Sequence, residues 1–118
     1  MRTLAPEIFR KRQLIEGYFV RDVNEAVLVE FFTFLTKGLD LRTYGAPIVH
    51  ATSGQGKDAN QGYDAFVPLI DSGIYIAVWS NQRFLSVVLY TCKDFDERKA
   101  AQLVGQFFEI KEVEQKLF

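Results

Sequence analysis

Three apolar runs, separated by very short turns, constrain the fold of this chain more than any other feature. The runs cover residues 63–70, 74–79 and 84–92 and are rich in β-branched and aromatic side chains, which favour strands. Residues 71–73 join the first two runs, and residues 80–82 lead into the third. Because such short connections keep consecutive strands side by side, the pattern predicts an antiparallel meander of three strands.

A helix is predicted ahead of the meander. Apolar residues recur at three-and-four spacing from Val27 to Leu35, which is the period of one helix face. Asp22 or Asn24 offers the N-cap, because short polar side chains accept hydrogen bonds from the first turn. Gly38 is the predicted stop, since glycine readily takes the left-handed conformation that ends helices.

A second helix is predicted after the meander. Asp94 and Asp96 are its candidate N-caps, and their charges also suit the positive end of the helix dipole. Its apolar stripe consists of Ala100, Leu103, Val104 and Phe107. Shorter apolar runs at residues 13–20, 46–52 and 109–114 predict three further strands.

The order of these elements predicts the fold class. A strand, a helix, four strands, a helix and a last strand indicate an α+β two-layer sandwich, with an antiparallel sheet and two helices on one face. The length of 118 residues fits a single domain over residues 1–118. Apolar residues occupy both parities of the strands, as in residues 84–90, so both sheet faces are expected to be buried. Two helices cover only one face, and the chain is therefore predicted to form a homodimer.

Composition excludes several classes of function. Fourteen Lys and Arg nearly balance 15 Asp and Glu, so the net charge of −1 predicts no nucleic-acid partner. The basic residues 10–12 are interpreted as a solvated lead-in to the first strand. No apolar stretch approaches the roughly 20 residues of a membrane span, and no signal peptide is recognised. The expected location is the cytoplasm, without a membrane partner. One Cys and one His predict neither an internal disulfide nor a metal site.

One spacing along the meander carries a resemblance. Ser72 follows the acidic Asp71 at a strand-to-strand turn, Trp79 ends the next run, and Cys92 lies 20 positions after Ser72. This arrangement resembles the prokaryotic-type, pyruvoyl-dependent S-adenosylmethionine decarboxylase family. With the order of the elements, the resemblance extends over about residues 13–115. It implies the α+β sandwich of that family.

The resemblance also implies roles for individual residues. The bond between Asp71 and Ser72 would be the self-cleavage site, and Ser72 would become the pyruvoyl cofactor. Cys92 matches the proton donor of the family. Trp79 matches the tryptophan of its Trp-Pro-Glu motif, and Asp64 falls nearest to its second serine, so both are expected in substrate binding. The implied reaction is the decarboxylation of S-adenosylmethionine or a related amine, a lyase step of polyamine (spermidine) biosynthesis.

Several positions depart from the family pattern. The histidine that the family places five residues after the serine is Ala77, and a methyl group cannot move a proton. Gly73 stands where a second histidine commonly follows the serine, and Lys93 replaces the glycine after the cysteine. Ser80 and Asn81 replace the proline and glutamate of the motif. The sequence therefore predicts a chain that cleaves itself slowly or not at all.

Two function classes follow from these residues. Ser72 and Cys92 favour an enzyme of this family. Ala77, Ser80 and Asn81 favour a non-catalytic homologue that acts as a ligand-binding, regulatory or dimerisation module.

Two remaining features have simpler interpretations. His50 is the only imidazole and lies in an apolar run without a serine or acid at a recognisable spacing, so a structural role is expected. Residues 53–62 are rich in Gly, Asn, Asp and Ser and lack the Gly-Lys-Ser/Thr order of a phosphate loop. They are expected to form a flap beside a pocket.

Overall fold

The computed structural model describes residues 2–52 and 61–118. The elements are β1 (Lys11–Tyr18), α1 (Glu25–Gly38), β2 (Ile48–Ala51), β3 (Gly62–Leu69), β4 (Ser72–Trp79), β5 (Phe84–Thr91), α2 (Glu97–Phe108) and β6 (Glu114–Leu117). The strands form a six-stranded sheet in the order β2-β3-β4-β5-β1-β6. All of the pairings are antiparallel. Neither helix of the described chain is long and apolar enough to cross a membrane.

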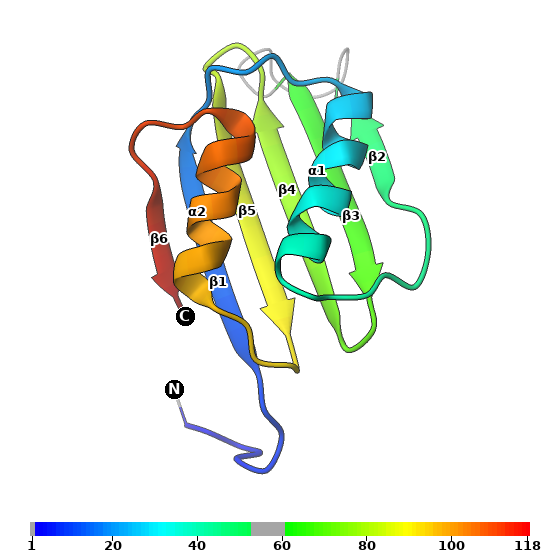
Figure 1. Cartoon of the computed structure of the whole chain (residues 1–118), viewed down its shortest axis with the longest axis vertical. Coiled ribbons are helices and arrows are strands. Elements are labelled where there is room, and N and C mark those ends of the chain that lie inside the picture. The colour runs from blue at the N-terminus through cyan, green and yellow to red at the C-terminus, as the bar shows by residue number, and fades with distance from the viewer. Residues whose placement is uncertain (1, 53–60) are drawn as a thin grey trace.

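Both helices lie on the same face of the sheet, α1 in front of β3 and β4 and α2 in front of β1 and β5 (Figure 1). The predicted α+β sandwich is confirmed, as is the meander of β3, β4 and β5. The core fills the space between the two layers. Its largest fully buried side chains are Ile15, Leu28, Phe31, Phe32, Leu35, Leu69, Ile74, Ile76, Leu85, Leu89 and Phe108.

The two helices meet through aromatic rings. The ring centroids of Phe31 in α1 and Phe108 in α2 lie 4.7 Å apart, a spacing typical of favourable ring pairs. The buried residues of α2 are Ala100, Val104 and Phe108, so the stripe runs to Phe108, whereas the predicted Phe107 is only partly buried. The last residue of α2, Phe108, is therefore buried in the core between α1 and the sheet.

Each helix begins at one of its two predicted caps. Asn24 rather than Asp22 caps α1, and its side chain accepts a hydrogen bond from a backbone N–H of the first turn. Asp96 rather than Asp94 caps α2 and accepts two such bonds. These bonds satisfy backbone donors that no carbonyl of the helix can reach.

The end of α1 differs from the prediction. Gly38 is the last helical residue, Leu39 is the C-cap with φ −102°, and the left-handed residue is Asp40 with φ 55°. Gly38 has another role, because a Cβ there would lie 2.5 Å from Cδ1 of Leu103. Glycine at this position leaves room for the end of the Leu103 side chain against α1.

Several strand boundaries also differ from the prediction. β1 begins at Lys11, and β6 occupies Glu114–Leu117 rather than residues 109–114. The chain cannot re-enter the sheet directly, because Glu109 takes a left-handed conformation that ends α2. Ser72 is the first residue of β4 and not part of the turn, which is formed by residues 70–71.

The sheet face opposite the helices, here called the open face, is not covered by any described element. Its exposed apolar side chains are Tyr18, Ile48, Phe66, Tyr75 and Tyr90. They alternate along the strands with residues buried under the helices, as the period of a strand requires. The structure thus leaves an apolar surface that a second layer could cover.

Gly62 offers a sharp test of this packing. A Cβ at Gly62 would lie 1.8 Å from the carbonyl oxygen of Val78, whereas a Cβ at Gly45 would meet nothing within 4 Å. We expect Gly62→Ala to destabilise the fold by about 2 kcal/mol or more, because backbone atoms of β4 must move. Gly45→Ala is the matched control and should leave the free energy of unfolding nearly unchanged. Urea denaturation followed by circular dichroism measures both, and equal midpoints would contradict the close β3–β4 contact.

Candidate functional site

The candidate site lies at the end of the sheet where the β3–β4 turn meets the end of β5. Ser72 pairs with Leu69 of β3 and with Thr91 of β5. Asp71, which precedes it in the turn, has φ 63°, a conformation that non-glycine residues adopt uncommonly. Thr91 is fully buried, and directly paired residues share one face of a sheet. The Ser72 side chain therefore lies on the face that the helices cover.

The polar groups around the bond between Asp71 and Ser72 have an unusual arrangement. The Ser72 hydroxyl oxygen is buried, and among the described residues it has no hydrogen-bond partner. The Asp71 carbonyl oxygen accepts a hydrogen bond of 2.9 Å from the backbone N–H of Cys92. A backbone N–H in this position draws electrons from the carbonyl and stabilises negative charge that develops on its oxygen. An unpartnered nucleophile thus sits one residue from a polarised carbonyl.

Cys92 is an exposed free thiol just beyond the end of β5. It lies at the same end of the neighbouring strand as Ser72, as the meander predicts. Side chains alternate between the two faces of a sheet, so Cys92, one position after Thr91, follows the open face. The two side chains therefore leave this end of the sheet on different sides and do not meet within one chain.

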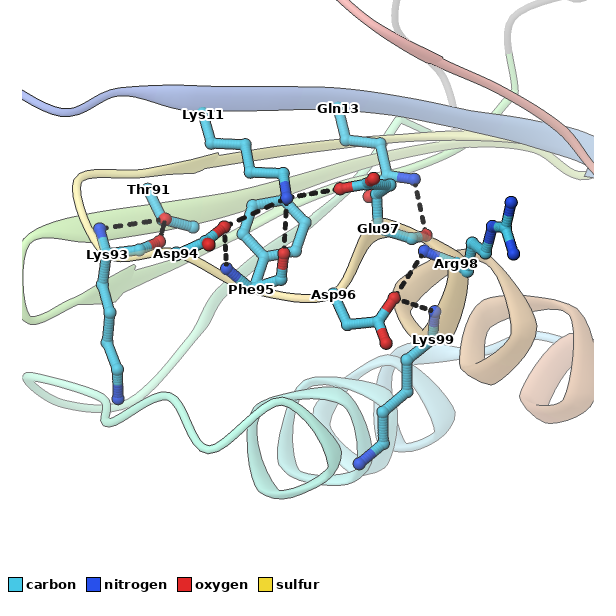
Figure 2. Close-up of polar contacts among 10 residues, drawn as sticks. All are labelled: Lys11, Gln13, Thr91, Lys93, Asp94, Phe95, Asp96, Glu97, Arg98 and Lys99. Atoms are coloured by element: carbon cyan, nitrogen blue, oxygen red, sulfur yellow. Dashed lines mark hydrogen bonds and ion pairs between the residues drawn. The ribbon is translucent and has the colours of Figure 1, made fainter.

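Lys11 anchors the segment that follows Cys92 (Figure 2). Its ammonium group contacts a carboxylate oxygen of Asp94 at 3.1 Å, the carboxylate of Glu97 and the backbone carbonyl of Phe95. It also lies 4.7 Å from the centroid of the Phe95 ring. The Lys11 side chain is only 16% exposed, so its interpretation as part of a solvated charge run was wrong. Nothing in the sequence separates Lys11 from its two basic neighbours, because the acids that pair with it are more than 80 positions away.

These contacts shift the titration of all three groups. Burial lowers the pKa of Lys11, but hydrogen bonds to Glu97 and Asp94 outweigh burial and raise it. The hydrogen bond from Lys11 lowers the pKa of Asp94 and that of Glu97. The cluster is therefore ionised in the folded protein at neutral pH.

Two further groups hold the same segment. The Thr91 hydroxyl accepts a bond of 3.1 Å from the Lys93 backbone N–H and donates to the Lys93 carbonyl, which bends the chain at Cys92. The Gln13 amide donates to the Glu97 carbonyl at 2.9 Å and to the Gln115 side chain at 2.9 Å. The backbone that presents the Cys92 N–H is thus fixed from β1 and from within its own turn.

Trp79 and Asp64 lie elsewhere. Trp79 is the last residue of β4, roughly 23 Å along the strand from Ser72 at about 3.3 Å per residue, and its ring packs 5.6 Å from that of Phe84. Asp64 of β3 accepts a hydrogen bond of 2.8 Å from the Tyr75 hydroxyl. Burial, with the help of Asp64, raises the pKa of Tyr75 to about 12. One chain therefore brings together Asp71, Ser72 and the backbone of Cys92, and it keeps Trp79 and Asp64 apart from them.

Ala77 lies on the open face, where it is 8% exposed. It is roughly 17 Å along β4 from Ser72, at about 3.3 Å per residue, and on the opposite face. A base at position 77 could not reach Ser72 of its own chain. Asp64 is the neighbour of Ala77 across β3, and His50 is the next residue across β2. Spacing in the sequence gave no sign that His50 and Asp64 are paired, because the pairing depends on sheet register.

Two further points concern the expected flap and possible metal ligands. The expected flap falls largely on residues 53–60, which lie outside the described residues. Within residues 2–52 and 61–118, no group of three or more His, Cys, Asp or Glu could hold a metal ion.

Comparison with known proteins identifies the family and a structure of similar fold. The family model described as S-adenosylmethionine decarboxylase matches residues 23–118. A crystal structure of the adenosylmethionine decarboxylase from Aquifex aeolicus VF5 is similar in fold, with a TM-score of 0.73 and 16% sequence identity, covering 94% of this chain and 89% of that chain. No curated protein sequence matches the chain.

The Lys11 cluster leads to a prediction with a defined sign. The folded-state pKa values of Asp94 and Glu97 are lowered. The two carboxylates therefore stabilise the fold at pH values above their ordinary pKa of about 4, and this stabilisation is lost as the pH falls through the folded-state pKa values. We expect Lys11→Met to lower the urea midpoint at pH 7 and to lower it much less at pH 2.5. Exposed Lys99→Met is the matched control. An equal loss at both pH values would contradict the charge pairing.

Proposed function

The chain belongs to the S-adenosylmethionine decarboxylase family, and from this premise we propose that it is a pyruvoyl-type carboxy-lyase that acts on S-adenosylmethionine or a related amine. The proposed metabolic role is polyamine (spermidine) synthesis. The observation that supports an active site most directly is the hydrogen bond of 2.9 Å from the Cys92 N–H to the Asp71 carbonyl oxygen. This hydrogen bond polarises the carbonyl of the peptide bond that precedes Ser72. Among the described residues, Ser72 is the one serine whose buried hydroxyl has no hydrogen-bond partner.

Self-cleavage would begin with attack of the Ser72 hydroxyl oxygen on the carbonyl carbon of Asp71. A C–O bond forms, the C–N bond breaks, and the hydroxyl proton ends on the freed amine of Ser72, leaving an ester. During this step negative charge develops on the Asp71 carbonyl oxygen, where the Cys92 N–H receives it. A base then removes the α-proton of Ser72, and the bond between the Ser72 β-carbon and the ester oxygen breaks. The leaving group is the main-chain carboxylate of Asp71, which becomes the C-terminus of the first fragment. Water completes the conversion to the pyruvoyl group and ammonia is released.

The residues at this end of the sheet fit the group that would arise there. A pyruvoyl carbonyl supplies the electron sink that a decarboxylation needs. The Cys92 thiol is exposed at the same end of the sheet, and we assign it the return of a proton to the substrate carbon. Because this thiol follows the open face, the assignment requires that the group formed from Ser72 turns toward that face once the chain is cleaved. Asp71, Lys11 and Thr91 act by position, because they shape and hold the turn that carries Ser72 and Cys92.

The base for the second step is the weak point of this site. Ala77 cannot accept a proton, and position 77 faces away from Ser72 of the same chain. A base at position 77 would therefore act on a second copy, where it would approach the α-proton of Ser72 from the open face, on the side of the backbone opposite the hydroxyl. We propose a homodimer through the open face, whose exposed aromatic residues are supporting evidence. Slow self-cleavage follows from the missing base.

The competing candidate is a non-catalytic homologue that binds a ligand or a partner subunit. Ala77, Ser80 and Asn81 favour it, because they remove the base and the acidic group that the family pattern places there. The two candidates differ in one property that can be measured, namely whether the bond before Ser72 breaks.

Intact mass spectrometry tests the proposal. We expect the wild-type chain to be mostly full length after purification, with slow release of two fragments that meet between Asp71 and Ser72. Ala77→His should raise the cleavage rate by about 10² to 10⁴-fold, because this is the usual contribution of a general base. Ser72→Ala is the control and should never cleave. If neither wild type nor Ala77→His cleaves while both stay dimeric, the non-catalytic candidate is correct.

A mixing experiment tests whether the base acts between copies. A chain with both Ala77→His and Ser72→Ala cannot be cleaved itself but can supply the histidine. When this variant is added to wild-type chain, it should accelerate cleavage of the wild-type chain. The control is the single variant Ser72→Ala, which lacks the histidine and should not accelerate cleavage. Acceleration only when histidine and serine share one chain would contradict the proposed dimer site.

A further inference from the structure

The segment ahead of β1, residues 2–10, is here called the N-terminal arm. It projects beyond the end of the sheet, away from both layers (Figure 1). Leu4, Ile8 and Phe9 are exposed by 78%, 52% and 49%. The one backbone hydrogen bond found in the described arm is internal, from the Ile8 N–H to the Ala5 carbonyl at 3.0 Å. The arm therefore shows apolar side chains that its own chain leaves uncovered.

The arm is also basic. Arg2 and Arg10 of the arm line a hollow of about 540 Å³ together with Arg12 of β1 and the apolar residues of the arm. Glu7 is the one acidic residue within residues 2–10. The arm thus combines apolar side chains with a positive charge, and a complementary surface should be apolar and acidic.

Such a surface lies at the opposite end of β1. A cavity of about 540 Å³, here called the end cavity, is lined by aromatic residues and by three glutamates with one lysine. The residues that matter are Tyr18, Phe84, Glu16, Glu112 and Glu114. The rings of Tyr18 and Phe84 pack against each other with centroids 5.2 Å apart, which gives the cavity an apolar wall.

An arm cannot readily fill the end cavity of its own chain. β1 has eight residues and is roughly 26 Å long at about 3.3 Å per residue. The arm would need to reverse its direction and run this whole length. Its turn from Ala5 to Ile8 shortens its reach. The N-terminal arm and the end cavity thus match in charge and polarity but lie at opposite ends of one molecule. Two copies are needed to bring them into contact.

We propose that the N-terminal arm of each copy docks in the end cavity of a second copy. This proposal rests on the proposed homodimer. When two sheets pack through their open faces with their strands running in opposite directions, the arm end of one copy lies beside the end cavity of the other. The two-fold axis repeats the contact, so two arms are exchanged. Arg2 and Arg10 then face Glu112 and Glu114, and Leu4, Ile8 and Phe9 cover Tyr18 and Phe84.

The exchange also selects the orientation of the dimer. Apolar sheet faces alone allow several relative directions of the strands, because the hydrophobic effect has no direction. The arms and the end cavities meet in only one of them. This orientation also directs position 77 of each chain toward the Ser72 end of the other.

Disulfide trapping tests the contact. In a Cys92→Ser background, Leu4→Cys and Glu112→Cys place one thiol on the arm and one at the end cavity. After mild oxidation, we expect a reducible species of twice the chain mass on a denaturing gel. The matched control replaces Leu4→Cys by Val29→Cys, an exposed position on α1, and should stay at the mass of one chain.

Each other outcome has a defined meaning. A disulfide within one chain, seen as loss of free thiols without a change in mass, would overturn the proposal, because the arm would then fill its own cavity. A dimer in sedimentation without any cross-link would overturn the arm exchange and leave the dimer of the proposed function intact. A monomer of the unmodified protein at micromolar concentration would overturn both.

A second measurement does not depend on added thiols. Ile8→Asp with Phe9→Asp should raise the dissociation constant of the dimer about tenfold or more, the effect expected of buried apolar anchors. Val29→Asp, again on α1, should change it little. These residues are exposed in the single chain, so circular dichroism should show folded protein for both variants. An unchanged dissociation constant in the arm variant would overturn the proposal.

Discussion

Two helices cannot cover both faces of a six-stranded sheet, and this geometric constraint determines most of what the molecule can do. α1 and α2 share one face and bury its apolar side chains. The open face keeps exposed aromatic residues. Large exposed apolar surfaces mark interaction sites. The single chain therefore has a fully packed core but leaves an apolar surface for a binding partner.

The same constraint divides the candidate site. The Ser72 side chain lies on the covered face, whereas Ala77 lies on the open face. Cys92, one position after Thr91, is also on the side of the open face. Only backbone connects the two sides, through the hydrogen bond from the Cys92 N–H to the Asp71 carbonyl. The Lys11 cluster matters for this reason, since it holds the segment on which that N–H depends. A small shift of the segment would remove the donor from the carbonyl it polarises.

The family pattern and the structure explain different parts of this site. The spacing of Ser72 and Cys92 along the chain predicted that both lie at one end of adjacent strands, since a meander with short turns allows little else. It could not predict Lys11, because the charges that pair with it come from the start of α2. Gly38 ends α1 as predicted, but the left-handed conformation expected there was wrong, and the role of this glycine in packing was missed for a similar reason. Its neighbour is Leu103 of the other helix, and a local pattern cannot reveal a contact between distant segments.

The sequence by itself determined the elements, their order and the antiparallel meander, because strand and helix periodicity and turn residues act within a few positions of the chain. It also determined the family, through residues whose spacing survives in the chain. The tertiary structure decided which face each side chain occupies in the assembled sheet, that β1 lies between β5 and β6, and that Trp79 and Asp64 are remote from Ser72. These properties depend on register and on packing between distant segments, which short-range sequence patterns do not encode.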